Sequence, residues 1–397
     1  MLPNLIDASA RGGGDFMKPK PGKQYIQQLR RRYQEASKAE KKIILDEFIK
    51  TTSYHRKSAI RILKNRYRYR TGKISRPRKR RYDLLDAIAL AKVCGLLDWI
   101  NARRIQPQIG VAIDSLVSAG ELHTAPEQKR KLVKIGHATI DRLLKTYRKR
   151  PVGKGKSYTK PGTLLKHQIP VRTFADWNEN RVGFEEIDLV GHDGGLAKGD
   201  FGWTLNFTDV KAQWTEQVAV KNKAQVHVFA GIKRIRGRLP FPLLGLDSDS
   251  GSEFINDQLF RYCTTEHITF TKGRAGKKND QAHIEEKNDS VVRRWVGYGR
   301  YDTVEQIDIL NELYEVLRLY INFFLPVMKL RKKVRIGSKI KKIYDKPATP
   351  YQRILRAKDV SKEVKDRLRK QYKTLNLVLL KRQIDEILKR LKPTPVR

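Results

Sequence analysis

Residues 243–257, LLGLDSDSGSEFIND, change from an apolar run to a group of acids within a few positions. Asp247 and Asp249 follow the apolar residues directly, and Glu253 and Asp257 come after a glycine. Because side chains alternate across a strand, a carboxylate at a strand end has buried neighbours while its own tip is free. Asp249 fits that position, and Asp247 shares its strand face. The stretch therefore predicts a buried strand whose carboxyl end carries an acidic site.

Other short β-rich segments surround this strand. FEEIDLVGH, GWTLNFTDV and WTEQVAV follow one another with only turns between them, as in an antiparallel meander. Helical stretches at residues 224–235 and 254–267 precede the strands FPLLGLDSD and ITFTK. This order predicts a mixed five-stranded sheet flanked by helices. Asp188, in the first segment, is a second acid at a predicted strand end.

A helix predicted over residues 279–296 supplies a third acid. Its apolar stripe consists of Ile284, Val291 and Trp295. Glu286 points away from this stripe into solvent, whereas Glu285 lies at the margin of the stripe, on the face shared with Asn288. Glu285 is therefore the better candidate for a site residue.

The composition indicates a nucleic-acid partner. Lys and Arg number 84 against 42 Asp and Glu, a formal net charge of +42. A solvated cationic surface without a specific partner is the alternative. Cys94 and Cys263 lie far apart in sequence, which argues against a zinc module or a disulfide framework and favours a reducing compartment. No apolar run approaches the roughly 20 residues that a membrane span requires.

The acidic segments together resemble a known family. EEIDLVGHDGG, then DSDSGSEF, then HIEEKN, with 35 residues between Asp249 and Glu285, are similar to the DDE catalytic core of transposases from bacterial insertion sequences, which is of the retroviral-integrase type. The matching acids are Asp188, Asp249 and Glu285. The resemblance spans nearly the whole chain and is sharpest over residues 186–299.

Two positions depart from the family pattern. Ser250 stands where the family usually has Asn, which barely affects the chemistry. Asp247 stands where His or Thr is more usual, which leaves the choice between Asp247 and Asp249 open.

The resemblance implies a ribonuclease H-like α/β core in which Asp188, Asp249 and Glu285 are catalytic and bind two Mg²⁺ or Mn²⁺ ions per active site. Two such ions align a water and offset charge on the phosphate, and Mg²⁺ prefers carboxylate oxygens. Water frees a 3′-hydroxyl, which then attacks target DNA in the same site. Because metal ions invert the local charge, a basic chain can gather acids here.

Two helix-turn-helix signals precede the core. Around TTSY, two short helices are predicted, and the second carries Arg56 and Lys57 on one side, as a helix in a DNA major groove requires. An ordinary helical hairpin is the alternative. The second signal is stronger because GHAT separates two apolar half-helices, the second of which bears Arg142. The predicted core of this second pair consists of Leu132, Ile135, Ile140, Leu143 and Leu144.

Basic segments are predicted to contact phosphates. Lys272, Arg274, Lys277 and Lys278 lie in a glycine-containing loop after the last strand, where a merely solvated loop is the alternative. A long helix over residues 304–324 has a wide apolar face that packs either on the core or on a partner subunit.

The chain is thus predicted to be multidomain, with an all-α helix-turn-helix N-terminal region, a ribonuclease H-like core and a basic C-terminal region. The boundaries are 1–22, a disordered extension; 23–82, a first helix-turn-helix domain and basic arm; 83–149, a second helix-turn-helix domain; 150–183, a linker; 184–300, the catalytic core; and 301–397, a helical and basic region. Met1 and Met17 both remain open as the true start.

The function expected from the resemblance is that of a DNA transposase, which cleaves the ends of a mobile element and joins them to target DNA. Its partners are double-stranded DNA, as terminal inverted repeats and target, and further copies of itself, at least a dimer on DNA. No membrane is expected, and the location is the bacterial cytoplasm at the nucleoid. Two alternatives stay open: a ribonuclease H-like nuclease that only cuts, and a domesticated DNA-binding regulator with an inactive core.

Overall fold

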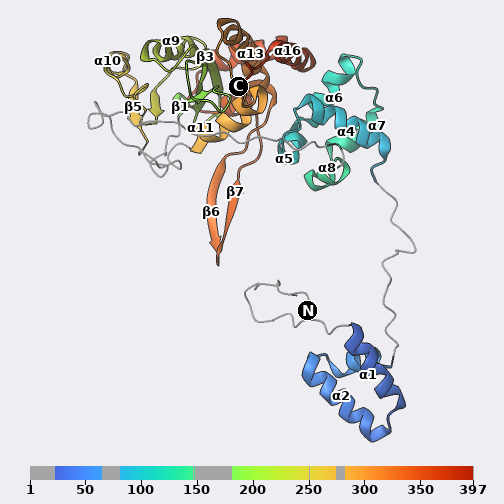
Figure 1. Cartoon of the computed structure of the whole chain (residues 1–397). Helices are drawn as coiled ribbons and strands as arrows, with labels where there is room; N and C mark the ends of the chain where they lie inside the picture. The colour runs from blue at the N-terminus through green and yellow to red at the C-terminus, as the bar shows by residue number, and fades with distance from the viewer. Residues whose placement is uncertain are drawn as a thin grey trace. The chain divides into compact units, whose positions relative to one another are not determined.

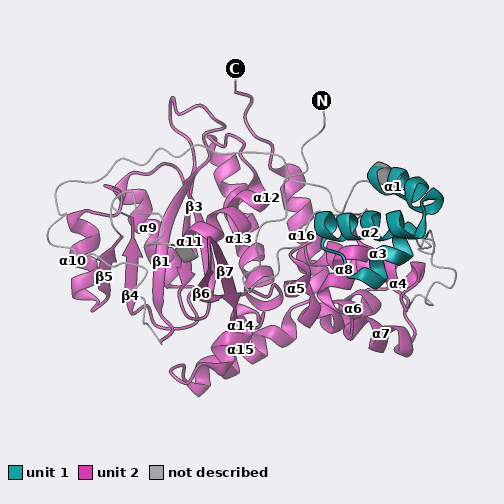
Figure 2. Cartoon of the chain, turned by 90° about the horizontal axis from the view of Figure 1, so that it is seen from below, with its two compact units in different colours: residues 1–80 teal, residues 81–397 magenta. Residues whose placement is uncertain are grey.

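The computed structural model describes residues 23–64, 81–145, 147, 181–249, 251–273 and 282–396. The chain divides into two compact units, residues 1–80 and residues 81–397 (Figure 2). The predicted extension, most of the basic arm and most of the linker lie outside the described residues. The predicted domain boundaries therefore stay predictions.

The first unit is a three-helix cluster of α1 (Lys23–Glu35), α2 (Lys38–Thr52) and α3 (Arg56–Leu63). Ser37 begins α2 through a capping box, in which its backbone N donates to Glu40 Oε2 at 2.8 Å. Phe48 and Leu63 are fully buried between the helices. Ile43 shares the helical spacing of the buried residues but is 66% exposed, because it lies on the outer side of α2.

The second unit begins with short helices. They are α4 (Leu84–Leu96), α5 (Ala102–Ile105), the 3₁₀ turn η1 (Gln106–Gln108), α6 (Ile109–Ser118), α7 (Pro126–Val133) and α8 (His137–Leu143). The predicted core of α7 and α8 is confirmed, since Leu132, Ile135, Ile140 and Leu144 are fully buried and Leu143 is partly buried. Whether these helices bind DNA stays a prediction.

A mixed five-stranded sheet follows, as predicted, in the order β3-β2-β1-β4-β5 (Figure 1). The strands are β1 (Phe184–Gly191), β2 (Trp203–Asp209), β3 (Thr215–Val220), β4 (Gly245–Ser248) and β5 (Thr269–Lys272). The first three are antiparallel neighbours, and β4 pairs in parallel with both β1 and β5. The predicted meander and the predicted order of strands and helices are both confirmed.

Helices cover both faces of this sheet. On one face, α9 (Gln225–Arg236) and α10 (Asp257–Thr265) bury Ile187, Leu205 and Phe207. On the other face lie α11 (Ala282–Lys287) and α13 (Val304–Phe324). The helix predicted over residues 279–296 is interrupted, because a π-helical turn, η4 (Asn288–Arg293), joins α11 to α12 (Arg294–Val296). Such a turn re-aims side chains relative to regular helical spacing.

The long helix α13 has the predicted bounds and packs on the sheet of its own chain. It completes the open edge of β3 with two asparagines. Asn311 Nδ2 donates to Ala219 O and Asn311 Oδ1 accepts from Ala219 N, both at 3.0 Å. Asn322 pairs in the same two-way manner with Thr215, at 2.8 and 2.9 Å. Because an open strand edge presents unpaired backbone groups, these contacts fix α13 to β3.

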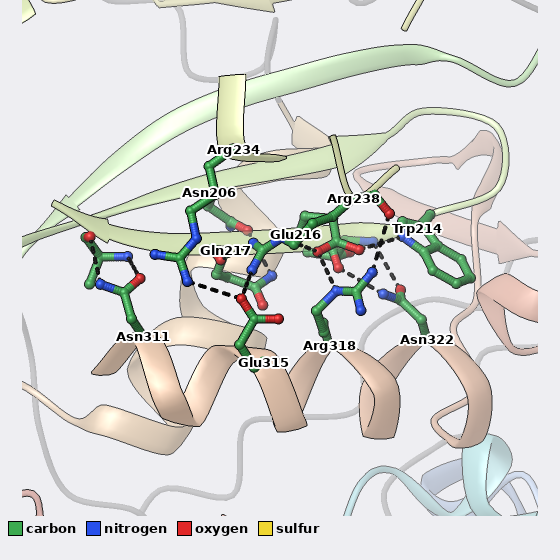
Figure 3. A network of polar contacts seen from close by, with 12 residues as sticks. Asn206, Trp214, Glu216, Gln217, Arg234, Arg238, Asn311, Glu315, Arg318 and Asn322 are labelled. Carbon is green, nitrogen blue, oxygen red and sulfur yellow. Dashed lines mark hydrogen bonds and ion pairs between the residues drawn. The ribbon is translucent and has the colours of Figure 1, made fainter. Parts of the chain in front are cut away.

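An ion network joins α13 to β3, to α9 and to the residues that follow α9 (Figure 3). Glu216 is fully buried and accepts from Arg318 Nε at 2.7 Å and from Trp214 Nε1 at 2.9 Å. Arg238 Nε lies 3.5 Å from the same carboxylate. Arg234 and Arg238 also pair with Glu315.

The C-terminal region is helical, as predicted, but it contains a β-hairpin that the sequence analysis missed. Strands β6 (Leu330–Ile336) and β7 (Lys339–Tyr344) form a separate antiparallel sheet. Helices α14 (Pro350–Arg356), α15 (Lys362–Thr374) and α16 (Leu377–Arg390) follow. Within the described residues, every helix is too short or too polar to cross a membrane.

Candidate active site

Parallel pairing of β1 with β4 brings the first two acids level with each other. The register pairs Glu186 with Asp247 and Ile187 with Ser248. Strand β4 ends at Ser248, so Asp249 follows it at the level of Asp188. Asp188 was predicted at a strand end, and this was wrong: β1 continues to Gly191 because β2 still pairs with it there. The two acids nevertheless meet where β4 stops.

Like charges and burial dominate the electrostatics of Asp188. Burial raises the pKa of Asp188 to about 7, and the nearby Asp249 and Glu285 carboxylates contribute in the same direction. Hydrogen bonds from Leu189 N, at 2.7 Å, and from Asn288 Nδ2, at 2.6 Å, act against this rise. The three predicted acids are therefore close enough to affect one another.

Asp249 is held by the turn that follows β4. Gly251 N donates to Asp249 Oδ1 at 2.9 Å. A Cβ at position 251 would lie 2.7 Å from Glu253 Cδ and 2.9 Å from Asp249 Oδ1, so this close approach requires glycine. Burial raises the pKa values of both Asp249 and Glu253.

Glu285 and Glu286 are neighbours in α11 with different surroundings. Both are exposed, while Ile284 beside them is fully buried. Glu285 acts on Asp188, whereas Glu286 acts on Arg104 and Lys287. Burial lowers the pKa of Lys287 to about 8, and Glu286 offsets part of that change. Glu285, the residue preferred from the sequence, is thus the one of the two that lies near the other acids.

Asp247 is engaged away from the candidate site. Its side chain is 1% exposed and accepts a hydrogen bond from Thr271 Oγ1 at 2.6 Å. Thr271 is also its register partner across β4 and β5. This bond gives Asp247 a structural role within the sheet and favours Asp249 as the site residue.

Three amide side chains that were not predicted as site residues support Asp188. We call Asn288, Asn206 and Gln217 the amide row. Asn288 donates to Asp188 Oδ2 and accepts from Asn206 Nδ2 at 3.0 Å. Asn206 in turn accepts from Gln217 Nε2 at 3.2 Å. Asp188, Asn206 and Gln217 are register partners across β1, β2 and β3, so the row crosses the sheet. Of the three amides, only Asn288, the last residue of HIEEKN, stood in a recognised sequence motif.

The donor chemistry of the site suits a hard divalent cation. Three carboxylates supply the oxygen ligands that Mg²⁺ and Mn²⁺ prefer. Burial and, to a lesser degree, the neighbouring carboxylates raise the pKa of Asp188, and a bound cation would offset both effects. Among the described residues, no three His, Cys, Asp or Glu side chains are yet arranged to hold a metal ion. Asp188 and Asp249 lie level, and Glu285, the third predicted ligand, is exposed on α11.

The predicted DNA-contacting residues are dispersed. Arg56 NH1 pairs with Asp46 at 2.6 Å, and Lys57 lies beside it at the start of α3. Arg142 is exposed on α8 and donates to Thr139 Oγ1 at 3.0 Å.

The predicted phosphate-binding loop is described only at its start. Lys272 was expected in a flexible loop, but it is the last residue of β5 and only 2% exposed, because β5 pairs with β4 up to that position. Arg274, Lys277 and Lys278 lie outside the described residues. The role of Arg274, Lys277 and Lys278 in DNA binding stays a prediction.

Solved structures similar to this chain include integrase domains. The catalytic core domain of BIV integrase is 17% identical, with a TM-score of 0.29, and the match covers 43% of this chain and 91% of that one. The HTLV-2 integrase catalytic core domain in complex with magnesium is 12% identical, with a TM-score of 0.29, over 37% and 91% of the two chains. TM-scores this low support no inference about function.

No family model matches the chain. A curated protein, the uncharacterized protein y4rM of Sinorhizobium fredii (strain NBRC 101917 / NGR234), is 37% identical over 334 residues. The match covers 83% of this chain and 93% of y4rM, and so includes most of both proteins. The chain therefore belongs to the same protein family as y4rM of Sinorhizobium fredii.

Proposed function

We propose that the protein is a DNA transposase of the DDE type, a polynucleotidyl transferase that cleaves the ends of a mobile element and joins their 3′-hydroxyls to target DNA. One observation carries the proposal: Asp188 and Asp249 lie level where β4 ends, and Glu285 acts on the same carboxylate. The net charge of +42 supports a DNA substrate.

In this proposal, Asp188, Asp249 and Glu285 hold two Mg²⁺ or Mn²⁺ ions. When bound, the ions supply an activated water and offset charge on the phosphate. The protein contributes orientation: Leu189 N and Asn288 Nδ2 each hold one oxygen of Asp188. No side chain serves as a covalent nucleophile.

The remaining parts of the chain bring DNA to the site. Arg56, Lys57 and Arg142 are proposed to recognise the terminal inverted repeats, and Arg274, Lys277 and Lys278 to hold phosphates near the acids; Lys272 is too buried in β5 for that role. Joining two ends to one target requires two active sites, and one chain has a single set of acids, so at least a dimer forms on DNA. The proposed location is the bacterial nucleoid.

The experiment uses the DNA on either side of the coding sequence of this protein, where the proposal requires inverted repeats. Labelled DNA carrying one repeat is incubated with the full chain, Mg²⁺ and a target plasmid, and the products are separated by size. We expect label joined covalently to the plasmid. Cleavage without joining would indicate a nuclease, and binding without either product would indicate a regulator with an inactive core; both results contradict the proposal.

A further inference from the structure

The hairpin of residues 330–344 is densely cationic. We call it the arm; it is not the basic arm that was predicted before residue 83. It contains no Asp or Glu and seven cations. All seven are exposed. They are Arg331, Lys332, Lys333, Arg335, Lys339, Lys341 and Lys342.

The arm stands apart from the rest of its unit. Figure 1 shows β6 and β7 projecting away from the five-stranded sheet. Its partly buried residues, Leu330, Val334 and Ile343, belong to none of the three hydrophobic cores of the described residues. A two-stranded hairpin without a third strand or a covering helix is only marginally stable in water.

The base of the arm, by contrast, is firmly attached. Asp345 accepts from Lys329 N at 2.7 Å and pairs with Arg353 NH1 at 2.7 Å. Asp345 N also donates to Lys329 O at 2.9 Å. The arm is thus held at one end and presented to solvent along its length.

Cations occupy both faces of the arm. The register pairs Val334 with Lys341 and Arg335 with Ile340, so the two faces carry alternating sets of side chains. Lys333 lies directly opposite Lys342, and like charges in that position destabilise a hairpin. A polyanion would remove this repulsion, and the cations of the opposite face, Lys332, Lys339 and Lys341, offer it further contacts.

We propose that the arm binds double-stranded DNA by lying in the major groove and contacting phosphates on both of its walls. That groove, about 12 Å wide, admits a two-stranded ribbon. Six paired positions at about 3.4 Å each make the ribbon roughly 20 Å long. The turn of Gly337, with φ 58°, and Ser338 is narrow enough to enter the groove first.

Other polyanions fit the arm less well. Single strands are held by stacked aromatic rings, and the arm has only Tyr344, at its base. Duplex RNA has a major groove too narrow for side chains to read. An anionic membrane requires one apolar face, whereas both faces here are cationic.

The first test measures how DNA binding depends on salt. The full chain and its variant Lys333→Gln, Arg335→Gln, Lys342→Gln bind a labelled duplex in the presence of a chelator, so that no strand is cut. The matched control changes three exposed lysines of α15, Lys362, Lys370 and Lys373, to Gln, which removes the same net charge.

We expect the arm variant to lower the slope of log affinity against log salt by about 2 to 3, since each phosphate contact contributes about 0.9. The α15 control should change the slope by less than about 1. Equal changes in both variants would mean that only net charge matters and would overturn the inference. Lysines on an exposed strand edge can also serve only to prevent edge-to-edge pairing. In that case the slope of log affinity against log salt would be the same in the arm variant and in wild type, which would also overturn the inference.

The second test locates the groove with a single thiol. Cys94 and Cys263 are buried, so Ser338→Cys adds the only exposed thiol among the described residues. The tether on the DNA ends in a mixed disulfide, so that the Cys thiolate displaces a small thiol by exchange. We expect this exchange with a tether on cytosine N4, which faces the major groove, and none with a tether on guanine N2, which faces the minor groove. Crosslinking to the guanine tether, or to neither, would contradict the proposed placement. Thr374→Cys on α15 is the control thiol.

The inference rests on the proposed function only in that DNA is the substrate. A wild-type chain that fails to bind any duplex would contradict the transposase itself. A wild-type chain that binds duplex DNA while the arm variant matches its control would contradict the arm alone.

Discussion

Two carboxylates in the same sheet, the buried Glu216 on β3 and the partly buried Asp188 on β1, have opposite surroundings. Glu216 is satisfied by the cations Arg318 and Arg238 and by the indole of Trp214. Asp188 receives a backbone N–H and the amide of Asn288, and its charged neighbours are acids. Glu216, which joins α13 to β3, is therefore paired with cations. Asp188, in the candidate site, has acids as its charged neighbours, and its pKa is raised.

The amide row explains how Asp188 stays oriented without a cation. Each amide donates toward Asp188, and Asn288 and Asn206 each accept from the next amide. Among the described residues, Gln217 Oε1 at the far end has no hydrogen-bond partner. The row can therefore reverse all its amides if the group at position 188 changes from an acceptor to a donor. Glu216 has no such freedom, because Arg side chains only donate.

The largest effect is expected from Glu216→Gln. This change leaves Arg318 and Arg238 buried beside a neutral group, and breaking a buried pair in this way costs about 3–5 kcal/mol of the free energy of unfolding. Urea denaturation followed by tryptophan fluorescence measures it. Glu312→Gln is the control, since its ion pair with Arg390 is about half exposed and contributes less than about 1 kcal/mol. Equal losses of unfolding free energy in the two variants would mean that the Glu216 network stabilises the fold no more than an exposed ion pair does, which contradicts the prediction.

Asn288→Ala should affect activity more than stability. Without its amide, one oxygen of Asp188 loses its fixed orientation, and loss of such a supporting contact reduces activity about 10–100-fold. Joining assays at several Mg²⁺ concentrations should show that higher metal partly restores the rate. A variant with full activity at low Mg²⁺ would show that the amide row is not needed at the site.

A smaller and opposite effect on stability is expected from Asp188→Asn in metal-free buffer. The pKa of Asp188 is raised from 3.8 to about 7 in the folded state, so folding holds its proton more tightly than the unfolded chain does. Stability is therefore lost as pH rises through this window, and the charged form carries the full penalty above pH 7.

The variant should consequently be more stable than wild type at pH 8, by about 1 kcal/mol or roughly 2–4 °C in Tm. The gain should fade as pH falls below about 6. Added Mg²⁺ should stabilise the wild type and not the variant. If the Tm of the variant at pH 8 were lower than that of wild type, Asp188 would stabilise the fold as Glu216 does, and the contrast between the two acids would be wrong.

The sequence predicted the five-stranded sheet well because its signals are local. Alternating apolar strands and turn residues determined five strands and their order, and the acids at 188 and 249 stood at recognisable positions. Helical phase also separated Glu285 from Glu286. What it missed depends on contacts between distant residues: β1 extends past Asp188 only because β2 pairs with it.

The amide row and the arm were missed for similar reasons. Asn206 and Gln217 look like ordinary strand residues until the register aligns them with Asp188. The arm has few apolar residues and many lysines, a composition that favours a solvated segment over a strand. Its hairpin pairing becomes evident only from the register across Gly337 and Ser338.

The central claim is that Asp188, Asp249 and Glu285 act together, and the pair Glu285→Gln and Glu286→Gln tests it most directly. Both changes remove one charge from an exposed residue of α11, one beside Asp188 and one beside Lys287. Joining of repeat-end DNA to a plasmid in Mg²⁺ is measured for both variants at equal DNA occupancy. We predict that Glu285→Gln loses more than about 100-fold while Glu286→Gln stays within about threefold of wild type. Similar rates in the two variants, or a larger loss in Glu286→Gln, would contradict the account.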